Sequence, residues 1–387
     1  MPEPVIVDAV RTPIGRAFKG SLAQLRPDDM GAFVVDALLE RNQEVDPELI
    51  EEVYCGVGLP QGLQGFNMGR IVALLSERLP LGTNGATVSR YCASSLESIR
   101  QASNAIVAGQ GDAYIAAGVE WVSRYNEAVE GAREQDQNRK LQGGNGHPDA
   151  YISMGLTAEN VAERYEVSRA DMDKYAQRSQ ELAVQSQESG YFDREIVPVT
   201  LPDGNVVSKD DGPRAGSTLE KLSQLDPAFK EDGKVTAGNS CPLNDGAAAV
   251  LVMSDTKAGE LGLKPRARII ASATAANEPE YMGVAPIWAI RKVLRQAGMS
   301  IEDVDTVELN EAFAAQVIPI MAECNIPLEK LNPHGGAIAL GHPFGMTGAR
   351  IMTTLLNGLE TDDKTIGLET MCVAGGQGQA MIVERLD

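Results

Sequence analysis

Cys92 is the residue whose surroundings most clearly predict chemistry. The run 86–91 predicts a strand that stops at the cysteine, and an amphipathic stretch from Ala93 to about Gly109 predicts a helix behind it. A thiol at a helix N-terminus meets exposed backbone amides and the positive end of the helix dipole, so we expect it to ionise more easily than a free thiol. A thiolate can attack a carbonyl carbon and hold the acyl group covalently.

Two polar residues near the C-terminus could assist such a nucleophile. Asn310 stands between a predicted strand at 304–309 and a helix that opens at Glu311. Its amide could hold a water or an oxyanion, or it could simply cap the helix. His342 lies between Gly341 and Pro343 in a turn of constrained shape, where a histidine could serve as a base or be an ordinary loop residue.

A second cysteine repeats the setting of the first. Cys372 follows a predicted strand at 366–371 and precedes a glycine-rich stretch whose backbone amides can crowd around a ligand. The alternative is a buried thiol that acts as a small hydrophobic side chain, and this is how we interpret Cys55 and Cys324.

Two other classes of site are excluded by spacing. The glycines at 56–62 miss the dinucleotide-binding fingerprint by one residue and include a badly placed proline. The cysteines and histidines lack the paired close spacing of a structural zinc site, so we predict no metal.

The composition limits the partners and the compartment. A net charge of −20 over 387 residues argues against nucleic acid or an anionic membrane surface as a partner. The five cysteines are widely spaced, without CxxC pairs, and we see no signal peptide, so we expect a cytoplasmic protein with reduced thiols. No apolar run has membrane-spanning length.

The elements that must position these groups follow an α/β pattern, in which short β-branched runs alternate with helical stretches at both ends of the chain. The two sets of runs resemble each other in rhythm, which suggests an internal duplication. Predicted strands lie at 4–10, 51–57, 86–91, 113–118, 248–253, 267–273, 304–309, 366–371 and 379–384.

The middle of the chain, residues 120–231, is more polar. It includes a helix with Ser168 as the expected N-cap and an end at Gly190. This segment is either a solvated insertion or a subdomain that holds a ligand between the two α/β halves. One face of its helix carries Met172, Tyr175, Ala176, Ser179, Leu182 and Ala183.

Several motifs in order along nearly the whole chain make it resemble the thiolase family. They are Arg11-Thr12-Pro13-Ile14-Gly15, Cys92-Ala93-Ser94, 154–162, Thr236-Ala237-Gly238-Asn239, 245–249, Asn310-Glu311-Ala312-Phe313, Gly341-His342-Pro343 and Cys372. The resemblance implies a five-layered αβαβα core made of two similar halves. Residues 1–119 with 232–257 would form the N-terminal half, 120–231 an inserted CoA-binding loop domain, and 258–387 the C-terminal half.

The resemblance also implies an activity, the cleavage of a 3-ketoacyl-CoA by CoA to acetyl-CoA and a shortened acyl-CoA. Cys92 would accept the acyl group and His342 its proton. Cys372 would protonate the leaving acetyl-CoA carbanion and later deprotonate the incoming CoA. Asn310, through a water, and His342 would help hold the thioester oxygen. CoA is then a substrate, and no cofactor is needed.

The family pattern further points to residues that would bind CoA and the acyl chain. Arg214 would lie near the adenine end, and the channel would be lined by Phe229, Met154, Met282 and Phe313, with Cys241 near the pantetheine. Thiolases associate through their core, so the resemblance implies a homodimer or homotetramer and leaves open a partner subunit of a β-oxidation complex.

Three positions depart from the family pattern. Ser95 replaces a glycine and could crowd the nucleophile, Cys241 replaces a serine, and Ala374 replaces the first glycine of the last motif. Because Ser153 stands where many acetoacetyl-CoA thiolases carry a histidine, we favour a degradative thiolase of β-oxidation over an acetoacetyl-CoA thiolase. A non-catalytic CoA-ester or lipid binder would have lost one of the three central residues, and a ketoacyl synthase would leave Cys372 unexplained.

Overall fold

The structure is a computed structural model that describes residues 2–124, 137–144 and 146–386. In it, the strands of the first half of the chain form one sheet. The strands lie in the order β4-β3-β5-β8-β1. β3 is parallel to β4 and β5, whereas β8 is antiparallel to β5 and β1. Their bounds are β1 Pro4–Arg11, β3 Ile50–Val57, β4 Asn84–Val88, β5 Ala113–Trp121 and β8 Asn244–Ser254.

The second half repeats this connectivity in the order β10-β11-β12-β9, with β10 parallel to β11 and β12 antiparallel to both its neighbours. A parallel bridge from Val307 to Leu331 takes the place of the outermost strand. The two sheets join where β1 pairs with β9 at Val5 and Ile6. The fold therefore has two similar halves. The strands are β9 Ala267–Ala276, β10 Thr306–Leu309, β11 Ile366–Val373 and β12 Gln377–Arg385.

All nine predicted strands are present, but the one before Cys92 ends earlier than expected. β4 stops at Val88, and Tyr91 takes a φ of 44°, in the left-handed region, so the chain has left the sheet before the cysteine.

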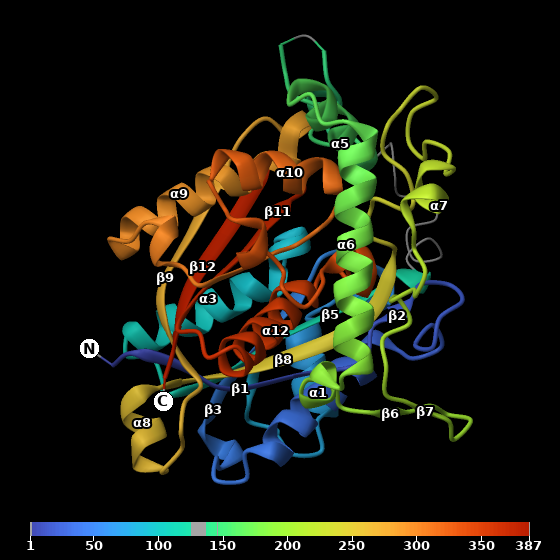
Figure 1. Cartoon of the computed structure of the whole chain (residues 1–387). Coiled ribbons are helices and arrows are strands. Elements are labelled where there is room, and N and C mark those ends of the chain that lie inside the picture. The colour runs from blue at the N-terminus through green and yellow to red at the C-terminus, as the bar shows by residue number, and fades with distance from the viewer. Residues whose placement is uncertain (1, 125–136, 145, 387) are drawn as a thin grey trace.

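Helices cover both sheets and fill the space between them (Figure 1). α1 and α2 pack on the outer face of the first sheet, α9 and α10 lie on the outer side of the second, and α3 packs against α12 between the sheets. This gives the five layers. The helices are α1 Pro27–Arg41, α2 Met68–Leu75, α3 Ser94–Val107, α9 Pro286–Ala297, α10 Ala314–Glu323 and α12 Thr347–Thr361.

Three apolar clusters hold these layers together. Along a strand, alternate side chains point to opposite faces of the sheet and so belong to different clusters. On β8, Leu251 and Met253 belong to the outer cluster with α1, whereas Val250 and Val252 belong to the central cluster with α3 and α12. Both faces of the strand are buried, which is why its sequence is apolar throughout.

The middle segment carries the long helix α6, Arg169–Glu188, which crosses the front of Figure 1 and packs against α10 and α11, Ala337–Leu340. Ser168 caps it, as predicted, by accepting from the amide of Asp171, and Gly190 follows its end with a φ of 76°. The predicted face is buried except for Leu182, which is half-buried. The remaining elements are β2 Gly15–Arg16, α5 Met154–Arg164, β6 Val199–Thr200, β7 Val206–Val207, α7 Leu219–Ser223 and α8 Asp255–Glu260.

The predicted domain boundaries, 119/120, 231/232 and 257/258, remain a prediction, and residues 125–136 and 145 of the loop domain lie outside the described residues. Among the described residues, no helix is both long and apolar enough to span a membrane.

Candidate active site

Cys92 lies in a single 3-10 turn, Tyr91–Ala93, that leads directly into α3. The Ser94 hydroxyl fixes this turn: its Oγ donates to the carbonyl of Tyr91 at 2.6 Å and accepts from the amide of Arg90 at 2.9 Å. The cysteine side chain is held at the start of the helix and is buried, with 8% of its surface exposed.

The prediction that the Cys92 thiol ionises more easily than a free thiol is wrong. Burial raises the pKa of the Cys92 thiol well above its usual range, and the nearby Cys372 and Glu120 add to the rise. The backbone N–H groups of Cys92 and Ala374 act in the opposite direction but do not outweigh desolvation. The resting group is therefore a thiol with two amides close to its sulfur.

His342 sits in the turn between α11 and α12, and its hydrogen bonds assign its tautomer. Nδ1 lies 2.7 Å from the hydroxyl of Thr347, which itself donates to the carbonyl of Pro343 at 2.8 Å. The Thr347 hydroxyl has only one proton and gives it to Pro343, so it can only accept from His342. Nδ1 of His342 therefore carries the imidazole proton and donates it to Thr347. Nε2 is left with its lone pair. The turn has Gly341 at a φ of 115°, and a Cβ there would collide with the Asn244 side chain.

Asn310 lies beside that lone pair. Its Nδ2 is 3.3 Å from Nε2 of His342, and its Oδ1 is buried without a hydrogen-bond partner among the described residues. The capping alternative does not hold, because α10 begins at Ala314 after Phe313. Burial, and secondarily Arg350, lower the pKa of His342 to about 3, so the imidazole is neutral near pH 7.

Cys372 is connected to this pair by hydrogen bonds. Its Sγ donates to Oε1 of Gln316 at 2.9 Å, and Nε2 of Gln316 donates to the carbonyl of Asn310 at 3.3 Å. Burial, with a smaller contribution from Cys241, raises the pKa of Cys372 to about 12. Cys92, Cys241 and Cys372 each influence the ionisation of another, so the three free thiols lie together.

Sequence reasoning missed Gln316 and a second polar residue, Glu120. Buried in β5, Glu120 accepts from the amides of Gly58 at 2.8 Å and Gly345 at 2.7 Å, and from Nε2 of Gln64 at 2.6 Å. It thus ties the turn of His342 to the first half of the chain, and burial raises its pKa to about 7. In the sequence, each of these residues is a polar residue within an apolar run, and this pattern could have marked it as a site residue.

Ser95 does not crowd the nucleophile. Its side chain points away toward α12, where Oγ accepts from the amide of Ala349 at 2.9 Å. Gly118 leaves space for the Ser95 side chain, because a Cβ atom at residue 118 would lie 2.5 Å from the Cβ of Ser95. Ala374, the third departure, keeps the backbone amide that faces Cys92.

Replacing Ser95 with glycine should therefore lower stability and leave turnover unchanged. The buried amide of Ala349 would lose its acceptor, at a cost of about 1–3 kcal/mol in the free energy of unfolding. Urea titration measures this cost. Ser98→Ala, which removes another buried hydroxyl of α3, is the matched control and should cost less, because its bond is to the helix carbonyl of Ser94. A several-fold rise in turnover of Ser95→Gly would contradict the assignment.

Most residues predicted to bind the acyl chain and pantetheine gather on the outer face of the second sheet. Phe229 and Phe313 meet edge to face with their ring centroids 5.9 Å apart, and Phe229 is 42% exposed. The predicted residues Met282, Phe313, Met154 and Cys241 share one apolar cluster with Cys372.

Arg214 lies apart from them at a cavity of about 150 Å³. The side chain of Arg214 is exposed, and its backbone amide donates to Oε1 of Gln180. Arg16 lines the same cavity. Two guanidinium groups at one opening suit an anionic ligand.

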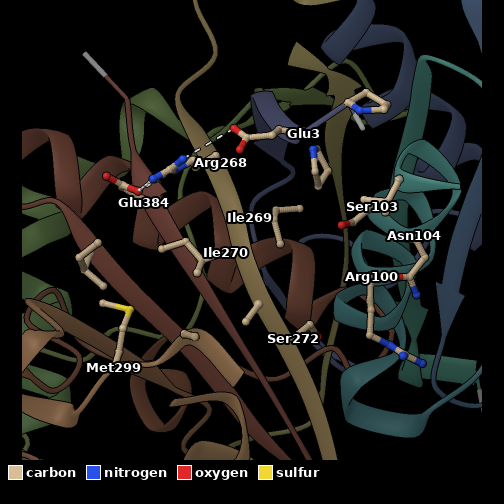
Figure 2. Close-up of a pocket in the computed structure, with 16 residues that line it drawn as sticks. Glu3, Arg100, Ser103, Asn104, Arg268, Ile269, Ile270, Ser272, Met299 and Glu384 are labelled. Atoms are coloured by element: carbon tan, nitrogen blue, oxygen red, sulfur yellow. Dashed lines mark hydrogen bonds and ion pairs between the residues drawn. The ribbon is translucent and has the colours of Figure 1, made fainter. Parts of the chain in front are cut away.

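Another cavity, of about 830 Å³, contains none of the predicted site residues. It lies between β9 and α3, and Figure 2 shows Arg268 there between Glu3 and Glu384, both of which it pairs with. Within the described part of the chain, no three His, Cys, Asp or Glu side chains come together as a metal site would need.

Comparison with known proteins finds thiolase relatives that match nearly the whole chain. The family model described as the thiolase N-terminal domain matches residues 4–256, and that of the thiolase C-terminal domain matches 263–385. A beta-ketoadipyl-CoA thiolase of Acinetobacter baylyi is 44% identical over 98% of this chain and 99% of its own length. A 3-ketoacyl-CoA thiolase of Idiomarina loihiensis is 42% identical over the full length of both. The dimeric peroxisomal thiolase of Saccharomyces cerevisiae superposes with a TM-score of 0.91 at 38% identity, covering 100% of this chain and 98% of that one.

Proposed function

The chain belongs to the thiolase family, and from this we propose that it cleaves 3-ketoacyl-CoA esters of fatty-acid β-oxidation with CoA, through an acyl group on Cys92. The observation that carries the proposal is the hydrogen-bonded chain from Cys372 through Gln316 and Asn310 to His342, with the Cys92 thiol close to Cys372.

In the first half-reaction, Sγ of Cys92 attacks the ketone carbon of the substrate and its proton passes to Nε2 of His342, which holds a lone pair. The bond between the carbonyl carbon and the α-carbon then breaks. Its electron pair goes to the α-carbon, which takes the proton of the Cys372 thiol. Acetyl-CoA leaves, Cys92 keeps the acyl group as a thioester, and Cys372 is left as a thiolate.

In the second half-reaction, the Cys372 thiolate takes the proton of the incoming CoA thiol, and the CoA sulfur attacks the thioester. Cys92 leaves as a thiolate and recovers its proton from His342. The amides of Cys92 and Ala374, which face the sulfur of Cys92, would donate to the oxygen of its thioester. Asn310, through a water, and His342 would hold the thioester oxygen of the acetyl-CoA that leaves.

The relatives are named for different acyl substrates, so the acyl chain is chosen among three candidates. Cleavage of ketoadipyl-CoA is the second candidate, favoured by the 44% identity to the Acinetobacter protein. An acetoacetyl-CoA thiolase is the third. The apolar Met154, Met282 and Phe313 near Cys372 support an apolar acyl chain.

The test is to incubate the protein with CoA and, in turn, a long-chain 3-ketoacyl-CoA, 3-ketoadipyl-CoA and acetoacetyl-CoA, and to follow product thioesters by mass spectrometry. We expect the highest kcat/KM with the long-chain substrate. A preference for either of the other two would reassign the substrate class, and no cleavage of any would refute the proposed activity.

We also propose that the chain forms a homodimer or homotetramer, in line with the dimeric yeast relative. β4 is the outermost strand of its sheet, and Phe66 and Leu81 near it are 92% and 77% exposed. Sedimentation of the protein as a single chain would refute this.

A further inference from the structure

The two turns that meet at the Cys92 sulfur come from different halves of the chain. The turn of Cys92 leads into α3 in the first half, whereas Ala374 lies in the turn between β11 and β12 in the second. Groups that act together on one reacting atom must be held to within about 0.5 Å of the productive geometry. A contact that joins the two turns would therefore set the geometry of acyl transfer.

One pair of side chains, which we call the Arg90–Gln377 bridge, joins the two turns. Nη1 of Arg90 donates to Oε1 of Gln377 at 3.1 Å. Arg90 lies two residues before Cys92, and its backbone amide donates to the Ser94 hydroxyl that fixes the turn of the cysteine. On the other side, Gln377 begins β12, and its Nε2 donates to the carbonyl of Ala374 at 3.4 Å. The bridge thus reaches from the backbone of one turn to the backbone of the other.

The turn that carries Ala374 is short, so its placement depends on the residue that closes it. β11 and β12 are paired as far as Val373 and Gln377, which leaves only residues 374–376 between them. The two glycines of this turn take left-handed φ values of 78° and 76°. Because Gln377 closes the turn, a bond to its side chain also fixes where the Ala374 amide points.

Arg90 is held for this contact by a buried carboxylate on α3. Its Nε lies 3.2 Å from Oε2 of Glu97, which is 4% exposed. Glu97 also accepts from Arg100 at 2.5 and 2.8 Å, and from Nε2 of Gln379 at 3.2 Å. Burial opposes ionisation of Glu97, but the bonds from Arg100 and the charge of Arg90 lower its pKa. Gln377 and Gln379 lie two residues apart on one face of β12, so both meet this cluster.

We propose that Gln377 is a positioning residue, whose bond to Arg90 holds the Ala374 amide in place for the acyl thioester. This amide donates to the thioester oxygen on Cys92 as negative charge develops there. The bridge acts on acyl transfer and not on proton transfer at the α-carbon, since the thiol of Cys372 is held from α10. The inference rests on the proposed function and adds a residue to it.

The test compares two partial reactions of acetyl-CoA in the wild type, Gln377→Met and Arg90→Met. Acetylation is followed by rapid quenching and intact-protein mass, and exchange of the methyl protons by NMR in D₂O. Each variant should be acetylated more slowly by roughly tenfold or more, as for a misplaced oxyanion donor, and should exchange methyl protons at nearly the wild-type rate. The side chain of Arg90 is 24% exposed, so Arg90→Met tests the same bond if Gln377→Met does not fold.

The double variant shows whether the two side chains act through one bond. Gln377→Met combined with Arg90→Met should be acetylated no more slowly than the single variants, because each of them has already lost the bond. Gln379→Met is the matched control, since it makes the same change on the same face of β12 and removes a bond to Glu97. Its acetylation should stay at the wild-type rate.

The outcomes separate this proposal from the proposed function. Acetylation at the wild-type rate in Gln377→Met and Arg90→Met would overturn the bridge. So would equal slowing of methyl exchange, equal slowing of acetylation in Gln379→Met, or effects that multiply in the double variant, since the cause would then be a general loss of packing. A wild type that neither acetylates nor exchanges would refute the proposed function itself.

Discussion

Replacing Cys92 with serine is expected to lower thiolysis of a 3-ketoacyl-CoA by roughly 10³-fold or more while substrate binding is retained. A hydroxyl is far harder to ionise than a thiol, and the buried position that already raises the pKa of Cys92 would raise that of an alcohol too. The turn should survive, because the bonds that hold it come from Ser94 and not from the cysteine.

The measurement is steady-state turnover, together with intact-protein mass after rapid quenching with substrate. The wild type should carry an acyl group and the variant little or none. Cys324→Ala is the matched control, since Cys324 is another buried thiol of the same fold and should keep its turnover. Wild-type turnover in Cys92→Ser would exclude Cys92 as the nucleophile.

The same residue shows where sequence reasoning succeeds and fails. Its place before α3 and its identity as a candidate nucleophile could be predicted, because a helix start is a local property. Its protonation could not. The helix end favours the thiolate, but desolvation depends on what the rest of the chain packs over the sulfur, and here desolvation outweighs the helix.

Strand positions were predictable for a related reason. β8 is buried on both faces, so its unbroken apolar run from Ala247 to Met253 marks it in the sequence. The order of the strands is a different matter, since nothing in β1 alone shows that it pairs with β8 and, over two residues, with β9. The resemblance to thiolases implied two similar halves in five layers, but this pairing was seen only in the structure.

The supporting residues of the site were the hardest to find. Glu120 and Gln316 are isolated polar residues in apolar elements, and each acts on a residue far away in the sequence. A single sequence shows that such a residue is out of place but not which partner it meets. Conversely, the concern about Ser95 was unfounded because Gly118, on a neighbouring strand, provides its space.

Replacing Cys372 with alanine should reduce thiolysis by roughly 10²- to 10⁴-fold, the usual contribution of a general acid and base, but for a different reason from Cys92→Ser. Without the thiol, the carbanion of acetyl-CoA has no proton donor, and carbon–carbon cleavage reverts. Transfer of an acetyl group from acetyl-CoA to Cys92 involves no carbon acid, and a CoA thiolate can leave without a proton donor, so acetylation should become slower but should not be lost.

Two partial reactions therefore separate the cysteines. Cys372→Ala should still gain an acetyl group by intact-protein mass and should fail to exchange the methyl protons of acetyl-CoA in D₂O, whereas Cys92→Ser should not be acetylated. Cys241→Ser is the matched control, because it changes a neighbouring thiol of the same cluster to the residue usual in the family and should keep both reactions. Methyl exchange at the wild-type rate in Cys372→Ala would remove it as the carbon acid, and the hydrogen bond from its sulfur to Gln316 would then only hold α10 in place against β11.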